Sequence, residues 1–229
     1  MATGARSLEE PHPVRLYNGD CMMREEFHRI YDQMPEDYRA ELIAGIVFEP
    51  SPVSYGHGTC HSRLTYLLET YSASTFGTEV AGDATLILGD EDEMQPDLML
   101  RITDTHGGQS HITEYGYIAG APELVAEVAY SSRAIDLHLK KERYALAGAV
   151  EYIVVCLNPK CMYWFDLRSG TQLRPDSKGV FRSRIFPGLW IHEKGLLDLD
   201  HGPTSRALEH GLKTAEHGMF VAALAAAAQ

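Results

Sequence analysis

Positive charge is scarce in this sequence. Its 229 residues include 20 lysines and arginines against 32 aspartates and glutamates, and the formal net charge is −12. Sequence-independent binding to nucleic acid depends on basic side chains that neutralise phosphates. A chain this acidic is therefore not expected to bind DNA or RNA tightly over its whole surface.

Long apolar runs are missing as well. No continuous apolar stretch approaches the roughly 20 residues that cross a bilayer, so the sequence predicts no membrane span. Residues 1–20 lack the basic cluster and following apolar stretch of a secretory signal. We therefore expect these residues to form a loose N-terminal leader.

Cysteines are few, and no two of them form a C-x-x-C pair. The chain has Cys21, Cys60, Cys156 and Cys161. That number is too small for a disulfide scaffold and favours reduced thiols in the cytoplasm. Cys156 and Cys161 flank a predicted turn and could face each other across a hairpin. We interpret them as reduced packing residues, with a bridge between them as the weaker alternative.

The length suits one sizeable core and is short for two independent ones. We therefore expect a single domain over residues 21–200, preceded by the leader at residues 1–20. Residues 201–229 are rich in alanine, which has the highest intrinsic helix propensity, and they predict a C-terminal helix over 204–228. This helix is either a packed cover or a dimerisation arm.

The positive charge that is present is concentrated in one stretch. Residues 133–184 hold ten basic side chains against five acidic ones, so this segment is locally positive. The simplest alternative is that these charged side chains form an ordinary solvent-exposed face of the protein. The basic residues are Arg133, Lys140, Lys141, Arg143, Lys160, Arg168, Arg174, Lys178, Arg182 and Arg184.

Hydrophobic periodicity predicts a mixture of helices and strands. Helical spacing covers residues 21–34, 59–71 and 134–147, and strand patterns cover 41–48, 123–130, 150–157 and 162–167. Three further strands at 76–81, 84–88 and 96–102 are expected to form an antiparallel meander. The polar, glycine-containing stretch 103–121 is expected to be a long loop or a ribbon insertion. One helical crossover among hairpins indicates an α/β fold around a mixed sheet flanked by helices.

Asp97 and Glu127 are the most informative polar residues, because each lies inside a predicted strand among apolar neighbours. A buried carboxylate that has no partner costs several kcal/mol, so it must be protonated, paired or bound to a cation. Two carboxylates that converge on adjacent strands would repel each other unless a divalent ion lies between them. Oxygen ligands of this kind suit Mg²⁺. The alternative for each residue alone is structural: Asp97 caps a strand after Pro96, and Glu127 pairs with an arginine.

A lysine on the following helix is the next candidate. Asp136 and Lys140 are four residues apart and share a helix face, where the simplest interpretation is an exposed ion pair. The sharper interpretation is that Lys140 points over the sheet and acts as a companion base. There it would hold an attacking water or neutralise charge that develops on a phosphate. Lys141 competes for this role.

His57 and His61 have the H-x-x-x-H spacing that can hold zinc on a helix. His57 lies between two glycines, near the expected helix start, and no glutamate fills the second position of the zinc-protease motif. Zinc is therefore the minor alternative at this position.

In sequence, the chain resembles the Uma-two family of restriction-endonuclease-like proteins, within the PD-(D/E)XK nuclease superfamily. The resemblance spans residues 41–159. It rests on an ordered series of residues: Glu41-Leu42-Ile43-Ala44-Gly45, His57, Gln95-Pro96-Asp97, Glu123 to Val128, Ser131, Asp136, Lys140, Tyr144, Gly148 and Glu151-Tyr152.

The resemblance implies a restriction-endonuclease-like core that holds a metal through Asp97, Glu127 and the Val128 carbonyl. The superfamily lysine two residues after the glutamate is Ala129 here, whereas Lys140 matches the lysine that this family places on the next helix. Glu41 and His57 correspond to positions near the site, as a metal-water contact and as a phosphate or proton partner.

The chain departs from the family pattern at two places. The usual Ser-Pro-Ser-Thr after the glutamate strand is Tyr130-Ser131-Ser132-Arg133, and the aspartate common in the first strand is Ala44. The expected metal ligands are all present, whereas the two departures fall at positions where the family pattern does not predict the substrate contacts of this chain.

The sequence-based hypothesis is Mg²⁺-dependent hydrolysis of phosphodiesters, with Mn²⁺ as a substitute ion and DNA as the substrate. A homodimer that assembles a basic cleft from residues 133–184 would offset the acidity of the chain. One alternative is a catalytically silent interaction module with the same fold. A second is a metal hydrolase that acts on a substrate other than nucleic acid.

Overall fold

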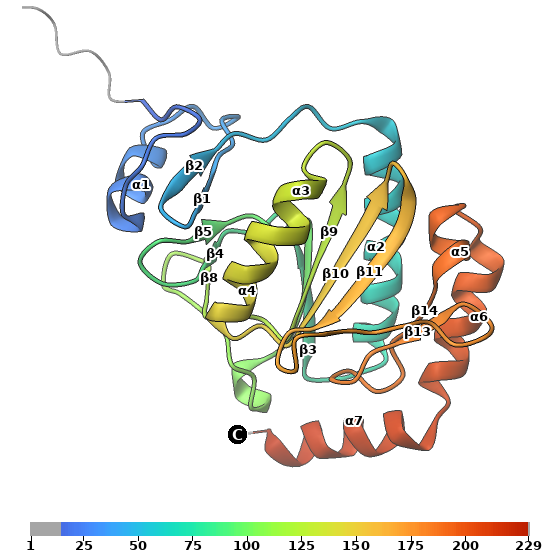
Figure 1. The fold of residues 1–229 in the computed structure, drawn as a ribbon. Helices are drawn as coiled ribbons and strands as arrows, with labels where there is room; N and C mark the ends of the chain where they lie inside the picture. Colours follow the sequence, from blue (N-terminus) through green and yellow to red (C-terminus); the bar gives the residue numbers. More distant parts are fainter. Residues whose placement is uncertain (1–14, 229) are drawn as a thin grey trace, which may run out of the picture.

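The computed structural model of the chain describes residues 15–228 (Figure 1). Most of the predicted leader, residues 1–20, lies outside this part. Its last residues run beside β2 (Ile46–Phe48), where the Gly19 amide donates to the Val47 carbonyl at 2.8 Å and the Leu16 side chain is buried. No helix in the described part is both long and apolar enough to cross a membrane.

The core is a mixed six-stranded sheet in the order β12-β11-β10-β9-β6-β3. β9 and β10 run parallel, and the other neighbouring strands run antiparallel. The α/β fold with a mixed sheet flanked by helices is therefore confirmed. The strands are β3 (Thr78–Gly82), β6 (Leu98–Ile102), β9 (Leu124–Ala129), β10 (Glu151–Leu157), β11 (Lys160–Asp166) and β12 (Thr171–Gln172).

A helical crossover joins the two parallel strands, as parallel strands require. It consists of α3 (Arg133–Ile135), a π-helical turn η2 (Asp136–Lys140) and α4 (Lys141–Ala147). The predicted helix over residues 134–147 is thus confirmed, although periodicity did not reveal the π-helical turn. Turns of this kind are rare, and they occur frequently at functional sites.

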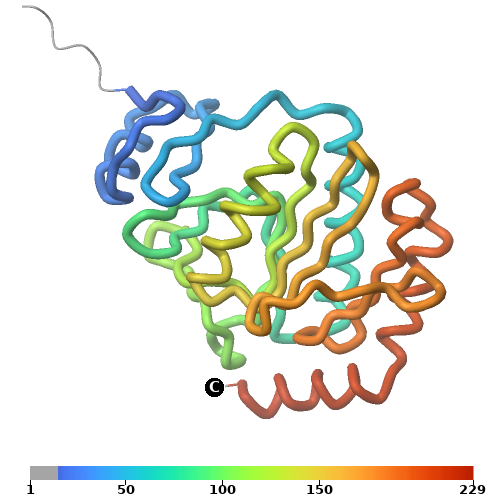
Figure 2. The backbone as a smooth tube through the Cα atoms, viewed as in Figure 1, coloured from blue at the N-terminus to red at the C-terminus, as the bar shows by residue number. Residues whose placement is uncertain are grey.

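Helices cover both faces of this sheet (Figures 1 and 2). On one face, α2 (Tyr55–Ala73) buries Leu64, Leu68 and Tyr71 against the sheet, beside α5 (Glu193–Leu197) and α6 (His201–Leu212). On the other face, the crossover helix packs Leu137 and Tyr144 against the side chains of β6, β9 and β10. Alternation along each strand separates these two cores.

A second sheet of short strands lies beside the first, in the order β2-β1-β5-β4-β8-β7. The prediction of one strand over residues 41–48 was wrong, because β1 (Glu41–Ile43) and β2 form a hairpin. Its two turn residues, Ala44 and Gly45, have φ values of 52° and 74°. Two consecutive positive φ values are typical of a tight hairpin turn, and an alanine gives little warning of one.

The predicted antiparallel meander was also wrong. β3 pairs directly with β6, while β4 (Leu86–Ile87) pairs with β5 (Glu93–Met94) in the second sheet. Local patterns indicate that a segment is extended, but they do not indicate its partner strand. Of the two alternatives for residues 103–121, a long loop or a ribbon, the ribbon is present: the segment contains η1 (Asp104–His106), β7 (His111–Ile112) and β8 (Ile118–Ala119).

The C-terminal region forms two helices instead of the single predicted one. α6 ends before Lys213, and α7 (Ala215–Ala227) begins after Thr214, whose side chain accepts a hydrogen bond from the His217 amide. This threonine cap starts a new helix and redirects the chain across the end of the domain (Figure 1). The remaining elements are α1 (Arg24–Tyr31), β13 (Val180–Arg182) and β14 (Trp190–His192).

Candidate functional site

Strand register places Asp97 and Glu127 side by side. β6 and β9 are antiparallel with Leu98 opposite Ala126, so the next step along both strands sets Asp97 opposite Glu127. Directly opposite residues share a face of the sheet, with Cβ atoms roughly 5 Å apart. The Asp97 amide donates to Glu127 Oε2 at 3.3 Å. The two carboxylates predicted to converge are therefore neighbours on the face covered by the crossover helix.

Asp97 is held by two donors. Its Oδ2 accepts from the Val128 amide at 2.6 Å, and its Oδ1 lies 3.3 Å from Nε2 of His57. Burial by itself raises the pKa of the Asp97 carboxyl, but the bonds from His57 and Val128 outweigh it and keep that pKa below its usual value. Because the amide and carbonyl of one strand residue face the same neighbouring strand, the Val128 carbonyl is also directed toward β6.

Glu127 is buried more deeply, with 4% of its surface exposed. Its Oε1 accepts from Lys140 Nζ at 3.0 Å and from the Tyr144 hydroxyl at 3.1 Å. Desolvation raises the pKa of the Glu127 carboxyl well above its usual value, although the Lys140 ammonium opposes this effect. Its basic partner is a lysine, where the structural alternative had expected an arginine.

Lys140 points into the site and is only 6% exposed. Its Nζ lies 2.8 Å from Glu41 Oε2 and 3.0 Å from Glu127 Oε1. Burial alone would lower the pKa of this ammonium, but the carboxylates of Glu127, Glu41 and Asp136 raise it above the usual value. Within residues 15–228, no ion pair joins Lys140 to Asp136.

Two neighbours of Lys140 take other positions. Asp136 is buried and accepts a hydrogen bond from the Ser132 hydroxyl at 2.6 Å. Lys141 turns away from the site and lies 4.7 Å from the centre of the Phe165 ring. The structure therefore places the two candidate lysines on different sides of the helix. Lys140 pairs with the buried Glu127 instead of forming the expected surface pair with Asp136.

Glu41 reaches the site from the second sheet. One of its oxygens, Oε1, accepts both from Lys140 Nζ at 3.0 Å and from the Gln95 amide at 2.8 Å. Gln95 lies two residues before Asp97. Glu41 therefore links the segment that leads into β6 with Lys140 on the crossover helix. The first-strand glutamate thus belongs to the same cluster, as the family resemblance implied.

His57 enters from the first turn of α2. It contacts Oδ1 of Asp97, whereas the Val128 amide contacts Oδ2. The Ser54 side chain caps the helix by accepting from the His57 amide at 3.2 Å. The hydrogen bond with Asp97 raises the pKa of the His57 imidazole above its usual value, against the effect of burial. Its Nδ1 is buried with no hydrogen-bond partner among the described residues.

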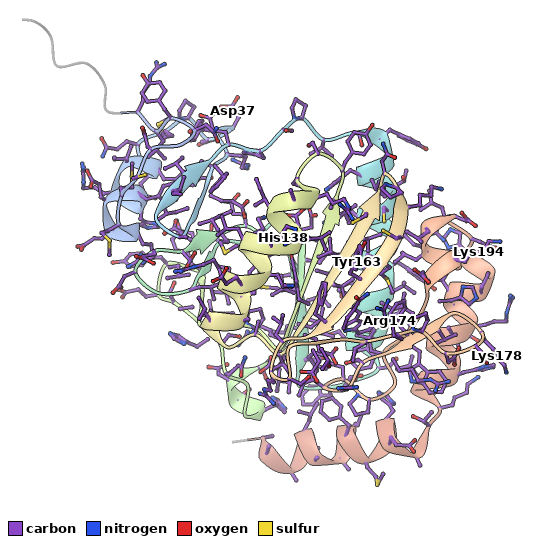
Figure 3. The ribbon with its side chains drawn as sticks, in the orientation of Figure 1. Asp37, His138, Tyr163, Arg174, Lys178 and Lys194 are labelled. Atoms are coloured by element: carbon purple, nitrogen blue, oxygen red, sulfur yellow. The ribbon has the colours of Figure 1, made fainter. Side chains whose placement is uncertain are left out.

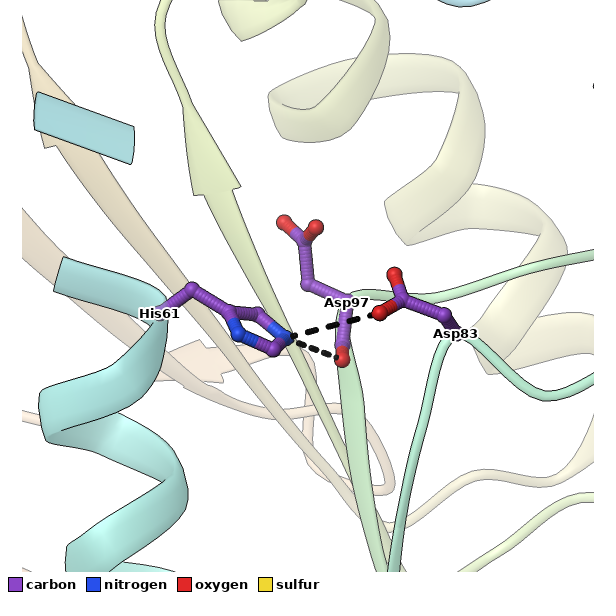
Figure 4. A group of neighbouring side chains, drawn as sticks. All are labelled: His61, Asp83 and Asp97. Atoms are coloured by element: carbon purple, nitrogen blue, oxygen red, sulfur yellow. Dashed lines mark hydrogen bonds and ion pairs between the residues drawn. The ribbon is translucent and has the colours of Figure 1, made fainter. Parts of the chain in front are cut away.

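His61 contacts a different atom of the same aspartate. Its Nε2 lies 2.9 Å from the Asp97 carbonyl oxygen and 4.0 Å from Oδ2 of Asp83, as Figure 4 shows. His61, Asp83 and Asp97 present ligand atoms close enough to hold a metal ion. Asp83 was not among the predicted residues; its positive φ of 52° after Gly82 belongs to a turn that the sequence pattern did not reveal.

The minor alternative placed zinc between His57 and His61, and the two side chains have a geometry that serves Asp97 instead. Their rings are stacked, with centroids 6.2 Å apart and planes inclined by 11°. Each Nε2 is directed at Asp97, one at the carboxylate and one at the carbonyl oxygen. Both histidines therefore position Asp97.

The carboxylate pair fits a hard divalent ion. Each carboxylate has one oxygen held by strong donors, namely Oδ2 of Asp97 and Oε1 of Glu127. The other oxygen of each, Oδ1 and Oε2, has only a 3.3 Å contact. Oxygen ligands are what Mg²⁺ and Mn²⁺ prefer, so these two atoms and the Val128 carbonyl form a suitable donor set.

Two comparisons with known proteins gave a match. The family model Uma2, described as a putative restriction endonuclease, matches residues 24–198. A crystal structure of a putative nuclease from Anabaena variabilis ATCC 29413 is similar with a TM-score of 0.54 at 12% identity. The match covers 80% of this chain and 97% of the other, and it supports a shared fold. No curated protein gives a significant sequence match.

Proposed function

The chain belongs to the Uma2 family of putative restriction endonucleases; from that premise we propose that it is a metal-dependent endonuclease that hydrolyses phosphodiester bonds in DNA. One observation carries the proposal: Asp97 and Glu127 are opposite each other, and each has one loosely held oxygen. A catalytic role for the site explains why the fold tolerates these buried charges.

Mg²⁺ is the proposed ion, and Mn²⁺ is expected to substitute for it. Asp97, Glu127 and the Val128 carbonyl would hold it. When bound, such an ion lowers the pKa of a coordinated water and polarises the phosphate. The raised pKa of Glu127 in the absence of an ion means that binding competes with a proton, so affinity should increase with pH.

The chain's own residues supply position and charge. The Val128 amide and His57 fix the direction of the Asp97 carboxylate, and Tyr144 and Lys140 fix that of Glu127. Because the surrounding carboxylates keep Lys140 protonated, we propose that it orients the attacking water and neutralises charge on the phosphate. This assignment replaces the earlier interpretation of Lys140 as a base.

Glu41 and His57 have supporting roles in this proposal. Glu41 holds the Lys140 ammonium and the Gln95 amide, and so sets the distance between the lysine and Asp97. His57 is the group able to exchange a proton at the open side of Asp97 Oδ1. A homodimer in the cytoplasm remains part of the proposal, because a second copy would bring a second basic segment, residues 133–184, to the substrate.

Metal binding and cleavage should be measured on the same variants. Isothermal titration with Mg²⁺ and Mn²⁺ is expected to detect binding by wild type and none by Asp97→Asn or Glu127→Gln. Plasmid and oligonucleotide DNA should be cut only by protein that binds metal. Metal binding without cleavage of single-stranded, double-stranded or branched DNA would contradict the nuclease proposal and favour a hydrolase of another substrate.

Two further variants test where the ion binds. Asp83→Asn and His61→Ala remove ligands of the alternative cluster around Asp97 but leave Glu127 intact. They are expected to retain Mg²⁺ binding. Loss of binding in these variants together with normal binding in Glu127→Gln would move the metal to that cluster. Unchanged binding in Asp97→Asn would favour the silent interaction module.

A further inference from the structure

The structure divides the basic stretch between residues 133 and 184 into two groups. One group is neutralised: Lys140, Arg143, Lys160, Arg182 and Arg184 each form ion pairs with carboxylates. Within residues 15–228 the ion pairs do not include the other group, Arg133, Lys141, Arg168, Arg174 and Lys178. Half of the ten basic side chains in this stretch are thus paired with carboxylates, and the unpaired positive charge is confined to the other five positions.

Arg133 and Lys141 differ from the rest of the second group because aromatic rings hold them. The Arg133 guanidinium lies 6.0 Å from the centre of the Tyr163 ring and donates to its hydroxyl at 3.2 Å. Lys141 Nζ lies 4.7 Å from the centre of the Phe165 ring. A ring face orients a cation without cancelling its charge, whereas a carboxylate does both. These two side chains are therefore fixed in place and remain positive.

The two rings form a regular platform. Tyr163 and Phe165 are two residues apart on β11, so their side chains project from the same face of the sheet. Their planes are inclined by only 2°, with centroids 6.1 Å apart. Both side chains are partly exposed. Figure 3 shows Tyr163 on the sheet and His138 on the neighbouring helix, on the face toward the viewer.

The crossover helix connects this platform to the site. Arg133 and Lys141 lie on its side toward β11, and Lys140, adjacent to Lys141 in sequence, points to Glu127 on the other side. The platform therefore begins about one helix diameter, roughly 10 Å, from the paired carboxylates. That separation corresponds to about three nucleotides along one strand of B-form DNA.

We propose that Arg133, Lys141, Tyr163 and Phe165, the cation–aromatic strip, bind the phosphate backbone of a nucleic-acid strand and lead it to Asp97 and Glu127. The inference rests on the proposed nuclease function and names the surface that its substrate uses. Arginine offers a planar fork and lysine a point charge to phosphate oxygens, and a phosphodiester strand presents such oxygens at regular intervals. An uncompensated positive strip on an otherwise acidic chain selects a polyanion.

Charge removal is the first test. Fluorescence anisotropy with a labelled DNA duplex and a single strand of equal length, in EDTA, measures binding without cleavage. The Arg133→Gln/Lys141→Gln variant is expected to bind at least about 10-fold more weakly than wild type. The slope of log affinity against log salt should decrease by about two for the duplex, since two phosphate contacts are lost. Circular dichroism and thermal melting confirm that the variants fold.

Lys178→Gln/Lys194→Gln is the matched control. It also removes two positive charges, but from residues that lie away from the strip (Figure 3). Binding within about twofold of wild type is expected, because steering by net charge alone is weak at moderate salt. An equal loss of affinity in the control and the strip variant would overturn the proposal, since net charge would then explain both.

The rings are tested separately with Tyr163→Leu/Phe165→Leu. This variant keeps every charge but releases Arg133 and Lys141 from their platform. An intermediate loss of about threefold to tenfold is expected, with the salt slope nearly unchanged. Wild-type affinity in both strip variants, with DNA still cleaved, would overturn the strip and leave the nuclease proposal standing; an acidic protein segment would then be the better occupant.

The opposite combination is also distinguishable. If wild type binds DNA through the strip but cuts no nucleic acid with Mg²⁺ or Mn²⁺, the strip stands and the proposed catalysis fails. If wild type binds neither duplex nor single strand at low salt, both are overturned.

Discussion

Glu127 and Glu151 are buried carboxylates on adjacent parallel strands, and their surroundings differ. Glu151 begins β10 opposite Leu124, whereas Glu127 lies further along β9 opposite Val154, so the two mark opposite ends of the strand pair. Glu151 accepts from Trp164 Nε1, the Ser183 hydroxyl and the amides of Arg184 and Ile185, at 2.6–3.3 Å. Glu127 depends on a single buried ammonium and one hydroxyl for its close contacts.

The comparison separates a structural carboxylate from one that is available to a ligand. Burial raises the pKa of both carboxyl groups. Fixed neutral donors surround Glu151 and fasten residues 183–185 to the sheet, so its oxygens are already occupied. Glu127 retains a loosely held oxygen beside Asp97. Burial alone therefore does not distinguish the two carboxylates; the number and kind of donors around each oxygen does.

The largest expected difference between the two ends is in catalysis. Asp97→Asn and Glu127→Gln should reduce DNA cleavage at least about 100-fold, because they remove charge that stabilises the reacting phosphate. Glu151→Gln should cleave within about twofold of wild type at 20 °C. The measurement is the initial rate of plasmid nicking with Mg²⁺. A loss in Glu151→Gln comparable to that in Glu127→Gln, in folded protein, would erase the distinction.

The next effect concerns stability at the Glu127 end. Lys140→Met leaves Glu127 and Glu41 without their cation, and removal of one partner of a buried pair costs about 3–5 kcal/mol of unfolding free energy. Adding Glu127→Gln to Lys140→Met should restore part of this loss, because the unpaired charge is then gone. Urea unfolding of the two single variants and the double variant measures the coupling. Additive effects would mean that the two residues do not depend on each other.

A third effect distinguishes the ends by pH. The pKa of Glu151 is raised above its usual 4.5 in the folded protein, so the folded state binds its proton more tightly than the unfolded chain. The stabilisation is fully present below pH 4.5 and is lost as pH rises through the folded pKa. The difference in unfolding free energy between wild type and Glu151→Gln should therefore decrease above pH 4.5. Urea unfolding at several pH values would show no such trend if the donors fully compensated burial.

The smallest effect is on thiol reactivity near the Glu127 end. Cys60 and Cys156 are buried, and burial raises the pKa of each thiol to about 11, whereas Cys21 is exposed. At pH 7.5 a thiol-specific reagent should label Cys21 at least about tenfold faster than Cys60 and Cys156, because only a thiolate reacts. Cys21→Ser should remove the fastest phase and leave the partly exposed Cys161 to react before the buried pair. Rapid labelling of Cys60 would show that this end opens to solvent.

Local patterns predicted some elements well and others poorly. The crossover helix follows helical periodicity over 14 residues, the hairpin of β10 and β11 follows two long apolar runs around a turn, and both are present where expected. The two- and three-residue strands of the second sheet lack such periodicity, so β5 was missed and β4 was assigned to the wrong neighbour. Short strands are specified by their partners more than by their own residues.

The site shows the same division. Asp97 and Glu127 were identified from the sequence because charge inside an apolar strand has few explanations. Lys140 was separated from Lys141 only by the direction of each side chain around the crossover helix. Asp83 and the Arg133–Tyr163 contact gave no local signal, since residues 14 and more positions apart meet there.

The sequence by itself determined the fold class, the principal strands, and that Asp97 and Glu127 are carboxylates that are expensive to bury. These properties depend on periodicity and on the free energy of transfer from water, both of which are local. Only the tertiary structure decided which oxygen atoms of those carboxylates are occupied and which basic side chains keep their charge. Both answers depend on donors and rings from distant segments, at distances that strand register and helix direction set.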